Sequence, residues 1–295
     1  MSRLEQKVAI VTGAGSGVGK EHALLLASEG AQVVVNDIGE AANETVSNIK
    51  ANGGKAVSHI GSVSDWNTGE DLVTTALDNF GDLHILINNA GILRDAMSFS
   101  MSEQEFDEVI DVHLKGHFVC ARSAAIYWRN QSKAGKDSTR RMIHTTSESG
   151  LFGGPAQSNY ASAKGGILTL SLTLGRELSK YGVTTNVVAP RARTGLTDYI
   201  QSMAAPESKE QFDIYDPANV SPFVVWLCTD EAQDVNGQAF IVGGSGVWWM
   251  RSWSHINHIK LDSQRFSIEQ INSMKDELFQ GDDTGIPTFA APTFG

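Results

Sequence analysis

The chain contains few cysteines and nothing that marks an exported protein. Of its 295 residues, two are cysteine, and both Cys120 and Cys228 lie inside apolar stretches. Small secreted proteins are commonly stabilised by several disulfides, and this chain has no pattern of paired cysteines. We therefore predict two buried thiols in a reducing compartment; a catalytic or metal-binding role for the cysteines is the alternative. No signal-peptide pattern opens the chain, and its last residues are not a peroxisomal S-K-L sequence. We therefore expect a cytoplasmic protein.

Positive charge is also scarce. The chain carries 23 Lys and Arg residues against 34 Asp and Glu residues, which gives a formal net charge of −11. A general binder of nucleic acid, or of an anionic membrane surface, needs a basic face, so we expect neither as a partner. No apolar run approaches the ~20 residues that span a bilayer. His255 and His258 lack further ligands around them, and we expect no metal site.

Glycine, by contrast, is abundant, and several of the 29 glycines separate apolar segments. Segments typical of short strands and of amphipathic helices alternate from Lys7 to about Val242. Such alternation predicts an α/β fold, a Rossmann-type doubly wound parallel sheet that binds its ligand at the carboxyl ends of the strands. We expect one domain over residues 1–246 and a C-terminal extension over residues 247–295.

The first strand of this pattern runs into a glycine-rich turn. The apolar residues 7–11 are followed by T-G-A-G-S-G-V-G at positions 12–19, which open an apolar helix. Glycines let the backbone approach a pyrophosphate closely, and the free N–H groups of the helix N-terminus bind it. The turn therefore predicts a dinucleotide site that includes Gly13, Ser16, Gly17, Val18 and Gly19.

A carboxylate ends the second strand. Asp37 follows an apolar run and lies eighteen residues after Gly19, where an acidic side chain hydrogen-bonds the 2′-hydroxyl of a ribose. Because a carboxylate there repels the extra phosphate of NADP, we expect NAD as the cofactor. A further apolar strand, residues 85–87, ends in the small-residue turn Asn88-Asn89-Ala90-Gly91.

A tyrosine and a lysine stand four residues apart later in the chain. Tyr160 and Lys164 share a face if their segment is helical. A neighbouring ammonium favours phenolate, so a phenol that otherwise titrates at about 10 can act as a general acid or base. Ser147 can follow a strand end and hold the oxygen of a substrate. A Y-x-x-x-K pattern alone is also typical of a surface tyrosine with a solvated lysine.

Together these residues resemble the short-chain dehydrogenase/reductase family over about residues 5–245. The resemblance rests on T-G-x-x-x-G-x-G, N-N-A-G, the serine with Y-x-x-x-K, and N-V-V-A-P at positions 186–190, in the family's order and spacing. It implies a nicotinamide cofactor, a homodimer or homotetramer, and Ser147, Tyr160 and Lys164 as catalytic residues. Tyr160 and Lys164 would also touch the cofactor. The other cofactor contacts that it implies are Ser62, Val63, Asn89, Ala90, Gly91 and Thr194.

The chain departs from the usual family pattern at two of these places. Ser62 stands where many relatives carry an aspartate that contacts adenine. His113 stands where the family usually places an asparagine that anchors a proton-relaying water; it either orients that water through its backbone carbonyl or is a packed core histidine. Two features, His113 and the presence of Arg191 directly after Pro190, make the chain similar to one branch of the family. This branch is the (3R)-hydroxyacyl-CoA dehydrogenase domain of peroxisomal multifunctional enzymes, which is also described as a 17β-hydroxysteroid dehydrogenase.

The segment after Pro190 covers the substrate in this family. Arg191 and Arg193 either attract the phosphates of an acyl-CoA or are solvated loop arginines. The polar residues 208–211 are typical of a closing lid.

The C-terminal extension opens with three tryptophans in six residues. Trp248, Trp249 and Trp253 either pack against the body or a second subunit, or form a wall of the substrate pocket. Residues 267–278 predict a short helix capped by Ser267. We expect residues 281–295 to be a tail that is disordered or lies over a neighbour.

The sequence as a whole predicts an NAD-dependent oxidoreductase that interconverts a secondary alcohol and a ketone, with a 3-hydroxyacyl-CoA as the substrate. A steroid alcohol is the alternative substrate, and Asp37 disfavours a biosynthetic 3-ketoacyl reductase because such enzymes commonly use NADPH. From a different class, the chain could be a non-catalytic NAD(H)-binding protein. The intact Ser147, Tyr160 and Lys164 argue against that reading.

Overall fold

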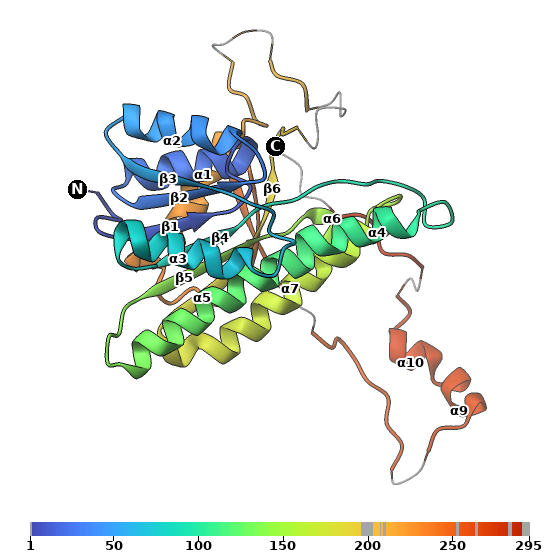
Figure 1. Cartoon of the computed structure of the whole chain (residues 1–295). Coiled ribbons are helices and arrows are strands. Elements are labelled where there is room, and N and C mark those ends of the chain that lie inside the picture. The colour runs from blue at the N-terminus through green and yellow to red at the C-terminus, as the bar shows by residue number, and fades with distance from the viewer. Residues whose placement is uncertain are drawn as a thin grey trace.

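A single mixed sheet forms the centre of the molecule (Figure 1). The computed structural model describes residues 2–195, 203–206, 208, 211–251, 254–262, 265–282 and 285–290. In this part of the chain the sheet has eight strands in the order β3-β2-β1-β4-β5-β6-β7-β8, of which the last is antiparallel to its neighbour. The strands are β1 (Val8–Val11), β2 (Gln32–Asp37), β3 (Lys55–Ile60), β4 (Ile85–Asn88), β5 (Arg140–Thr145), β6 (Val183–Arg191), β7 (Ala239–Gly243) and β8 (Gly246–Met250).

Helices cover both faces of this sheet, as Figure 1 shows. One apolar core lies between the sheet and α1, α2 and α8, and a second lies between the sheet and α3, α5 and α7. Alternate residues of β1 supply the two cores, because Ala9 and Val11 face the first and Val8 and Ile10 face the second. The predicted doubly wound Rossmann-type fold is therefore confirmed. The helices are α1 (Gly17–Ser28), α2 (Ala41–Ala51), α3 (Thr68–Phe80), α4 (Glu103–Ile110), α5 (Gly116–Lys133), α6 (Glu148–Phe152), α7 (Ser158–Leu178), α8 (Ser221–Trp226), α9 (Ile268–Ser273) and α10 (Lys275–Phe279).

The strand order reverses between β1 and β4, which lie side by side. A sheet of this kind opens a crevice at such a point, outside the carboxyl ends of its strands, where ligands bind. The glycine turn after β1 and the N-N-A-G turn after β4 both lie at this reversal. The fold thus brings two motifs together that are about seventy residues apart in sequence.

The first residues after Gly246 continue the sheet. Residues 246–250 form β8 on the edge of β7, so the expected boundary between residues 246 and 247 falls inside a strand. Trp248 lies against the guanidinium of Arg191, whereas Trp249 is 62% exposed and donates a hydrogen bond to Gln238. Neither tryptophan lines the central cavity described below. Trp253 lies outside the described residues.

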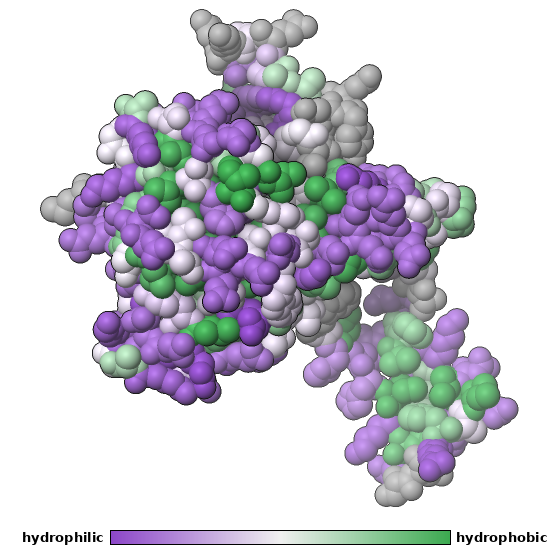
Figure 2. Space-filling model, in the orientation of Figure 1, coloured by the Kyte–Doolittle hydropathy of each residue, from purple (hydrophilic) through white to green (hydrophobic). Residues whose placement is uncertain are grey.

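Beyond β8 the extension carries α9 and α10, which project away from the body in Figure 1. The predicted helix is present in two pieces that meet at Met274, and Ser267 caps the first through a hydrogen bond with the backbone N–H of Gln270. Figure 2 shows apolar side chains on this segment, and Ile268 and Ile271 are exposed.

Both cysteines are buried, as expected, and burial raises the pKa of each thiol to about 12. Among the described residues, no helix combines the length and apolar character needed to cross a bilayer.

Candidate active site

One cavity of about 1260 Å³ lies at the carboxyl ends of the strands. It is bordered by the turns that follow β1, β2, β3 and β4, by the start of α7, and by the segment after β6. Every catalytic or cofactor-binding residue predicted from the sequence lines this cavity except Gly19, whereas Arg193 is not part of the lining. Those that line it are Gly13, Ser16, Gly17, Val18, Asp37, Ser62, Val63, Asn89, Ala90, Gly91, His113, Ser147, Tyr160, Lys164 and Thr194.

The glycine turn requires glycine for two different reasons. Gly13 and Gly17 have φ of +61° and +55°, a left-handed conformation that other residues adopt at a cost. A Cβ on Gly13 would also lie 2.7 Å from the Cα of Ala90. Gly19 does not face the cavity; a Cβ there would lie 2.2 Å from the carbonyl oxygen of Gly13, so it lets α1 pack closely against the turn.

Asp37 closes the turn from the side of β2. Its carboxylate accepts hydrogen bonds from the backbone N–H of Gly15 at 2.9 Å and of Ile38 at 2.8 Å. The preceding Asn36, which the sequence analysis missed although it adjoins Asp37, is buried and donates to the carbonyl oxygens of His59 and Gly61. The two side chains therefore fix how β2 and β3 end at the cavity.

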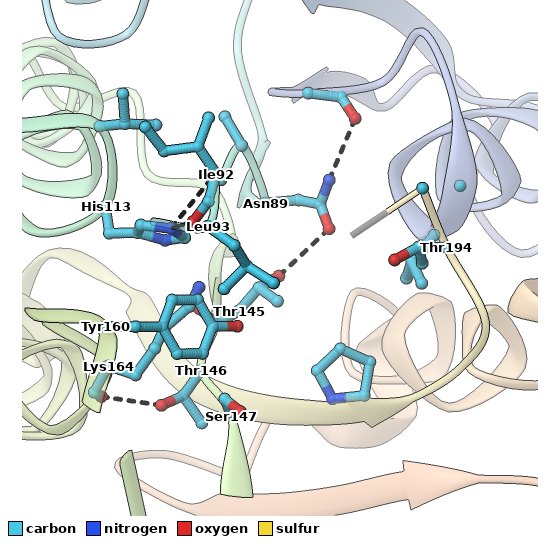
Figure 3. Close-up of a pocket in the computed structure, with 18 of the residues that line it drawn as sticks. Asn89, Ile92, Leu93, His113, Thr145, Thr146, Ser147, Tyr160, Lys164 and Thr194 are labelled. Carbon is cyan, nitrogen blue, oxygen red and sulfur yellow. Dashed lines mark hydrogen bonds between the residues drawn. The ribbon is translucent and has the colours of Figure 1, made fainter. Parts of the chain in front are cut away.

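Asn89 joins the ends of three strands. Its Nδ2 donates to the carbonyl oxygens of Thr12 and Gly13, each at 3.1 Å, and its Oδ1 accepts a long 3.5 Å hydrogen bond from Thr145 at the end of β5 (Figure 3). Thr12 in turn accepts a hydrogen bond from the backbone N–H of Asn89. The N-N-A-G turn is thus locked to the glycine turn by side-chain hydrogen bonds.

Tyr160 lies in the first turn of α7, with its phenol directed into the cavity (Figure 3). The start of that helix is held by Asn159, a fully buried side chain. Its Nδ2 donates to the carbonyl oxygens of Arg94 and Glu105, and its Oδ1 accepts from the backbone N–H of Tyr160. Such bonds fix where the helix begins and hence where the phenol points.

Lys164 lies one turn further along the same face, as its spacing predicts. Its Nζ is 5.6 Å from the centre of the Tyr160 ring and donates a 2.7 Å hydrogen bond to the carbonyl oxygen of Thr145. Thr146 donates to the carbonyl oxygen of Lys164, also at 2.7 Å. The side chain is buried, and loss of solvation lowers its pKa to about 7. Its proton is therefore weakly held at neutral pH.

Ser147 follows β5 and caps the short helix α6, where its Oγ accepts from the backbone N–H of Ser149 at 3.2 Å. Helix α6 packs directly on α7, because a Cβ on Gly150 would lie 2.6 Å from the carbonyl carbon of Lys164. Figure 3 shows Ser147 and Tyr160 on the same side of the cavity. The structure thus brings Ser147, Tyr160 and Lys164 together.

His113 lies in a π-helical turn, Asp111–Lys115, between α4 and α5. Single π turns are rare and concentrate at functional sites. The buried ring packs edge-on against Tyr160, with centres 5.1 Å apart, and its Nε2 is 2.7 Å from the carbonyl oxygen of Ile92. Burial lowers its pKa well below the usual value, so the ring is neutral. Its Nε2 donates to that oxygen or accepts from the backbone N–H of Ile92, 3.0 Å away, according to which ring nitrogen carries the proton. The ring of His113 is therefore packed in the interior in contact with the tyrosine, while orientation of a water by its backbone carbonyl stays a prediction.

The two arginines after Pro190 are not solvated loop residues, which corrects one of the sequence alternatives. Arg191 pairs with Glu148 at 2.6 Å, and both side chains are less than 20% exposed. Arg193 pairs with Asp213 and donates to the carbonyl oxygen of Met203. Because a carboxylate already neutralises each guanidinium, the structure gives little support to the prediction that these arginines attract the phosphates of an acyl-CoA.

Some cavity residues had no usable sequence signal. Thr145, Ile214 and Phe289 line the cavity from β5, from the segment before α8 and from the C-terminal tail. No group of three or more potential metal ligands occurs in the described part of the chain. Of the expected lid, Lys209 and Glu210 lie outside the described residues.

Similarity to known proteins agrees with this arrangement. The sequence profile described as short chain dehydrogenase matches residues 7–206. The chain is 41% identical to hydroxyacyl-CoA dehydrogenase ChsB1 of Mycobacterium tuberculosis, over 95% of this chain and 90% of that protein. It is 38% identical to mouse peroxisomal multifunctional enzyme type 2, over 84% of this chain but 33% of that longer protein.

Solved structures give the same result. A crystal structure of a short chain dehydrogenase from Mycobacterium avium superposes with a TM-score of 0.88 and 43% identity, covering 98% of this chain and all of that one. The cradle of glycines, the strand-end carboxylate and the buried lysine fit the nicotinamide cofactor of such proteins. The chain belongs to the short-chain dehydrogenase family of oxidoreductases.

Proposed function

We propose that this protein is an NAD-dependent dehydrogenase that oxidises the secondary alcohol of a 3-hydroxyacyl-CoA to a ketone. The observation that carries the proposal is that Ser147, Tyr160 and Lys164 border the same cavity as the glycine turn and Asp37. The names of the relatives support the substrate class, since one is a hydroxyacyl-CoA dehydrogenase and another a peroxisomal multifunctional enzyme.

The proposed chemistry divides between three side chains. Ser147 holds the hydroxyl oxygen of the substrate, and the phenolate oxygen of Tyr160 takes the proton from that hydroxyl as a general base. Lys164 stabilises the phenolate while it is an ammonium, and it would contact the ribose of the bound cofactor. The nicotinamide supplies the acceptor for the hydride that leaves the alcohol carbon.

The buried lysine suits proton transfer in both directions. With its pKa lowered to about 7, Lys164 gains or loses a proton near neutral pH at little free-energy cost. Once the ammonium has released its own proton to solvent, the neutral amine can receive the proton that Tyr160 takes from the substrate. In this proposal His113 is a positioning residue, because its edge-on contact restricts the ring of Tyr160.

The remaining contacts are proposed from their places around the cavity. The turn with Gly13, Ser16, Gly17 and Val18 would bind the pyrophosphate through backbone N–H groups. Gly19 acts indirectly, by allowing close packing of that turn. The expected partners of the adenine, the nicotinamide ribose and the carboxamide are Ser62, Val63, Asn89, Ala90, Gly91 and Thr194.

NAD rather than NADP is proposed because of Asp37, which stands at the end of β2 where the adenosine ribose would lie. We predict that Asp37→Ala weakens NADH binding by about tenfold, since it removes a charged hydrogen bond worth on the order of 1.5 kcal/mol, and leaves NADPH binding equal or tighter. Fluorescence titration of both nucleotides measures this. Tighter binding of NADPH than NADH by the unaltered protein would contradict the proposal.

The function itself is tested with a substrate panel. Purified protein with NAD should oxidise 3-hydroxyacyl-CoA esters at least tenfold more efficiently than steroid alcohols, measured as kcat/KM. Preference for a steroid would favour the alternative substrate, and NADH binding without turnover of any alcohol would favour the non-catalytic protein.

We also propose a cytoplasmic location and a homodimer or homotetramer. Microscopy of the tagged protein tests the location, and analytical ultracentrifugation tests the oligomeric state.

A further inference from the structure

The C-terminal tail returns to the cavity through one aromatic side chain. Phe289 lines the cavity and packs against Phe152 with ring centres 5.4 Å apart and ring planes at 65°, an edge-to-face contact. Phe289 is 43% exposed, so more than half of its surface is covered. Its position lies beyond residues 7–206 that the family profile matches, so the C-terminal extension contributes part of the cavity wall.

The partner of Phe289 sits close to the proposed reaction centre. Phe152 is the last residue of α6, whose N-cap is Ser147. At about 1.5 Å of rise per residue, the two ends of this helix are roughly 8 Å apart. A substrate whose oxygen is held at Ser147 would thus extend only a few bonds before it reached Phe289.

Other apolar side chains line the same cavity as Phe289. Leu93, Met203 and Ile214 also line the cavity, from the loop after β4 and from the segments before α8. The guanidinium of Arg191, which also lines the cavity, is already paired with Glu148. Apolar side chains of this kind suit a hydrocarbon chain or ring far better than a phosphate.

We infer that Phe289 is a specificity-determining residue that contacts the apolar part of the substrate beyond the oxidised carbon. The inference rests on the proposed function, since it names the part of the acyl substrate that this wall recognises. Phe289 favours long or bulky acyl groups, which reach it, over short ones, which do not.

The test compares a short and a long ester. We predict that Phe289→Ala raises KM for 3-hydroxydodecanoyl-CoA by about tenfold, the loss expected for one partly buried phenyl contact, and changes KM for 3-hydroxybutyryl-CoA less than twofold. Phe289→Leu should recover most of the loss because it keeps an apolar side chain. NADH affinity and the thermal unfolding midpoint are measured on every variant.

The extension offers a matched control. Phe279 ends α10, is also 43% exposed and is not part of the described cavity lining, so Phe279→Ala should leave both KM values unchanged. Equal effects of Phe289→Ala on the two esters, or the same effect from Phe279→Ala, would overturn the inference while the dehydrogenase activity stands. An unaltered protein that oxidises neither ester would overturn the proposed function first.

Discussion

At the scale of single residues, the site depends on a lysine whose charge the fold makes costly. Lys164 is buried, and its ammonium donates to the carbonyl oxygen of Thr145 rather than to solvent. Loss of hydration lowers its pKa from 10.5 to about 7. We infer that burial of this lysine lowers the stability of the fold and serves the reaction, because a lysine with that pKa exchanges protons at neutral pH.

This cost predicts a more stable but inactive variant. Between about pH 7 and 10.5 the unfolded chain keeps a proton on Lys164 that the folded chain has lost, so stability rises with pH across that window, and below it the full cost remains. Lys164→Met should therefore raise the free energy of unfolding at pH 7 by roughly 3 kcal/mol, and by less at pH 9.

Chemical denaturation of both proteins at the two pH values measures the difference. A variant that is less stable than the unaltered protein at pH 7 would show that the hydrogen bond to Thr145 outweighs the lost solvation.

At the scale of elements, one ion pair ties the short helix α6 to the sheet. Arg191, the last residue of β6, pairs with Glu148 in the first turn of α6 and lies over the ring of Trp248 on β8. The helix is five residues long, too short to be stable alone, so it depends on such contacts. Through it, Arg191 holds Ser147 in place.

If Arg191 acts on the serine, removing either partner of the pair should have the same effect. We predict that Arg191→Ala and Glu148→Ala each lower kcat by about tenfold for short and long esters alike, because a small displacement of Ser147 impairs the reaction. The double variant should be no worse than either single one.

Steady-state kinetics on the three variants decides the matter. A rise in KM for CoA esters with Arg191→Ala alone would instead restore the phosphate-binding role of this arginine.

At the scale of the whole molecule, the core buries several neutral histidines. His22 and His144 have pKa values lowered to about 3 by burial, and those of His113 and His117 are lowered well below the usual value. His117 and His144 lie with their Nδ1 atoms 3.2 Å apart, which requires one ring to donate to the other.

These histidines predict a protein that is sensitive to mild acid. As pH falls from about 6.5 towards 3, the unfolded chain binds protons that the folded chain excludes, so the free energy of unfolding falls. Between pH 7 and pH 5.5 we expect a loss of several kcal/mol, on the order of 1 kcal/mol per buried histidine. Urea unfolding at both pH values tests this, and constant or increasing stability would contradict it.

The sequence was sufficient for the features that repeat along a chain. The alternation of strands and helices predicted the fold. Parallel strands place their carboxyl ends at one edge of the sheet, which is why Gly13, Asp37 and Tyr160 border the same cavity. Contacts between segments that are far apart in sequence leave no repeating pattern in the sequence. The partner of Arg191 is 43 residues away and Phe289 reaches the cavity from a tail without a pattern, so neither contact could be predicted.

The edge strand was missed for a related reason. A run such as Val247-Trp248-Trp249 is apolar enough to pack anywhere, and its pairing with β7 depends on the turn at Gly244, where φ is +53°. A short apolar run does not reveal which strand it will join.

The measurement that tests the account most directly is the activity of Tyr160→Phe. The exchange removes one oxygen atom and keeps the ring against His113. We predict that kcat for a 3-hydroxyacyl-CoA with NAD falls at least about 100-fold, which is the rate contribution typical of a general base. The dissociation constant for NADH should change less than about threefold. Retention of activity with normal NADH binding would contradict the assignment of this phenol as the base.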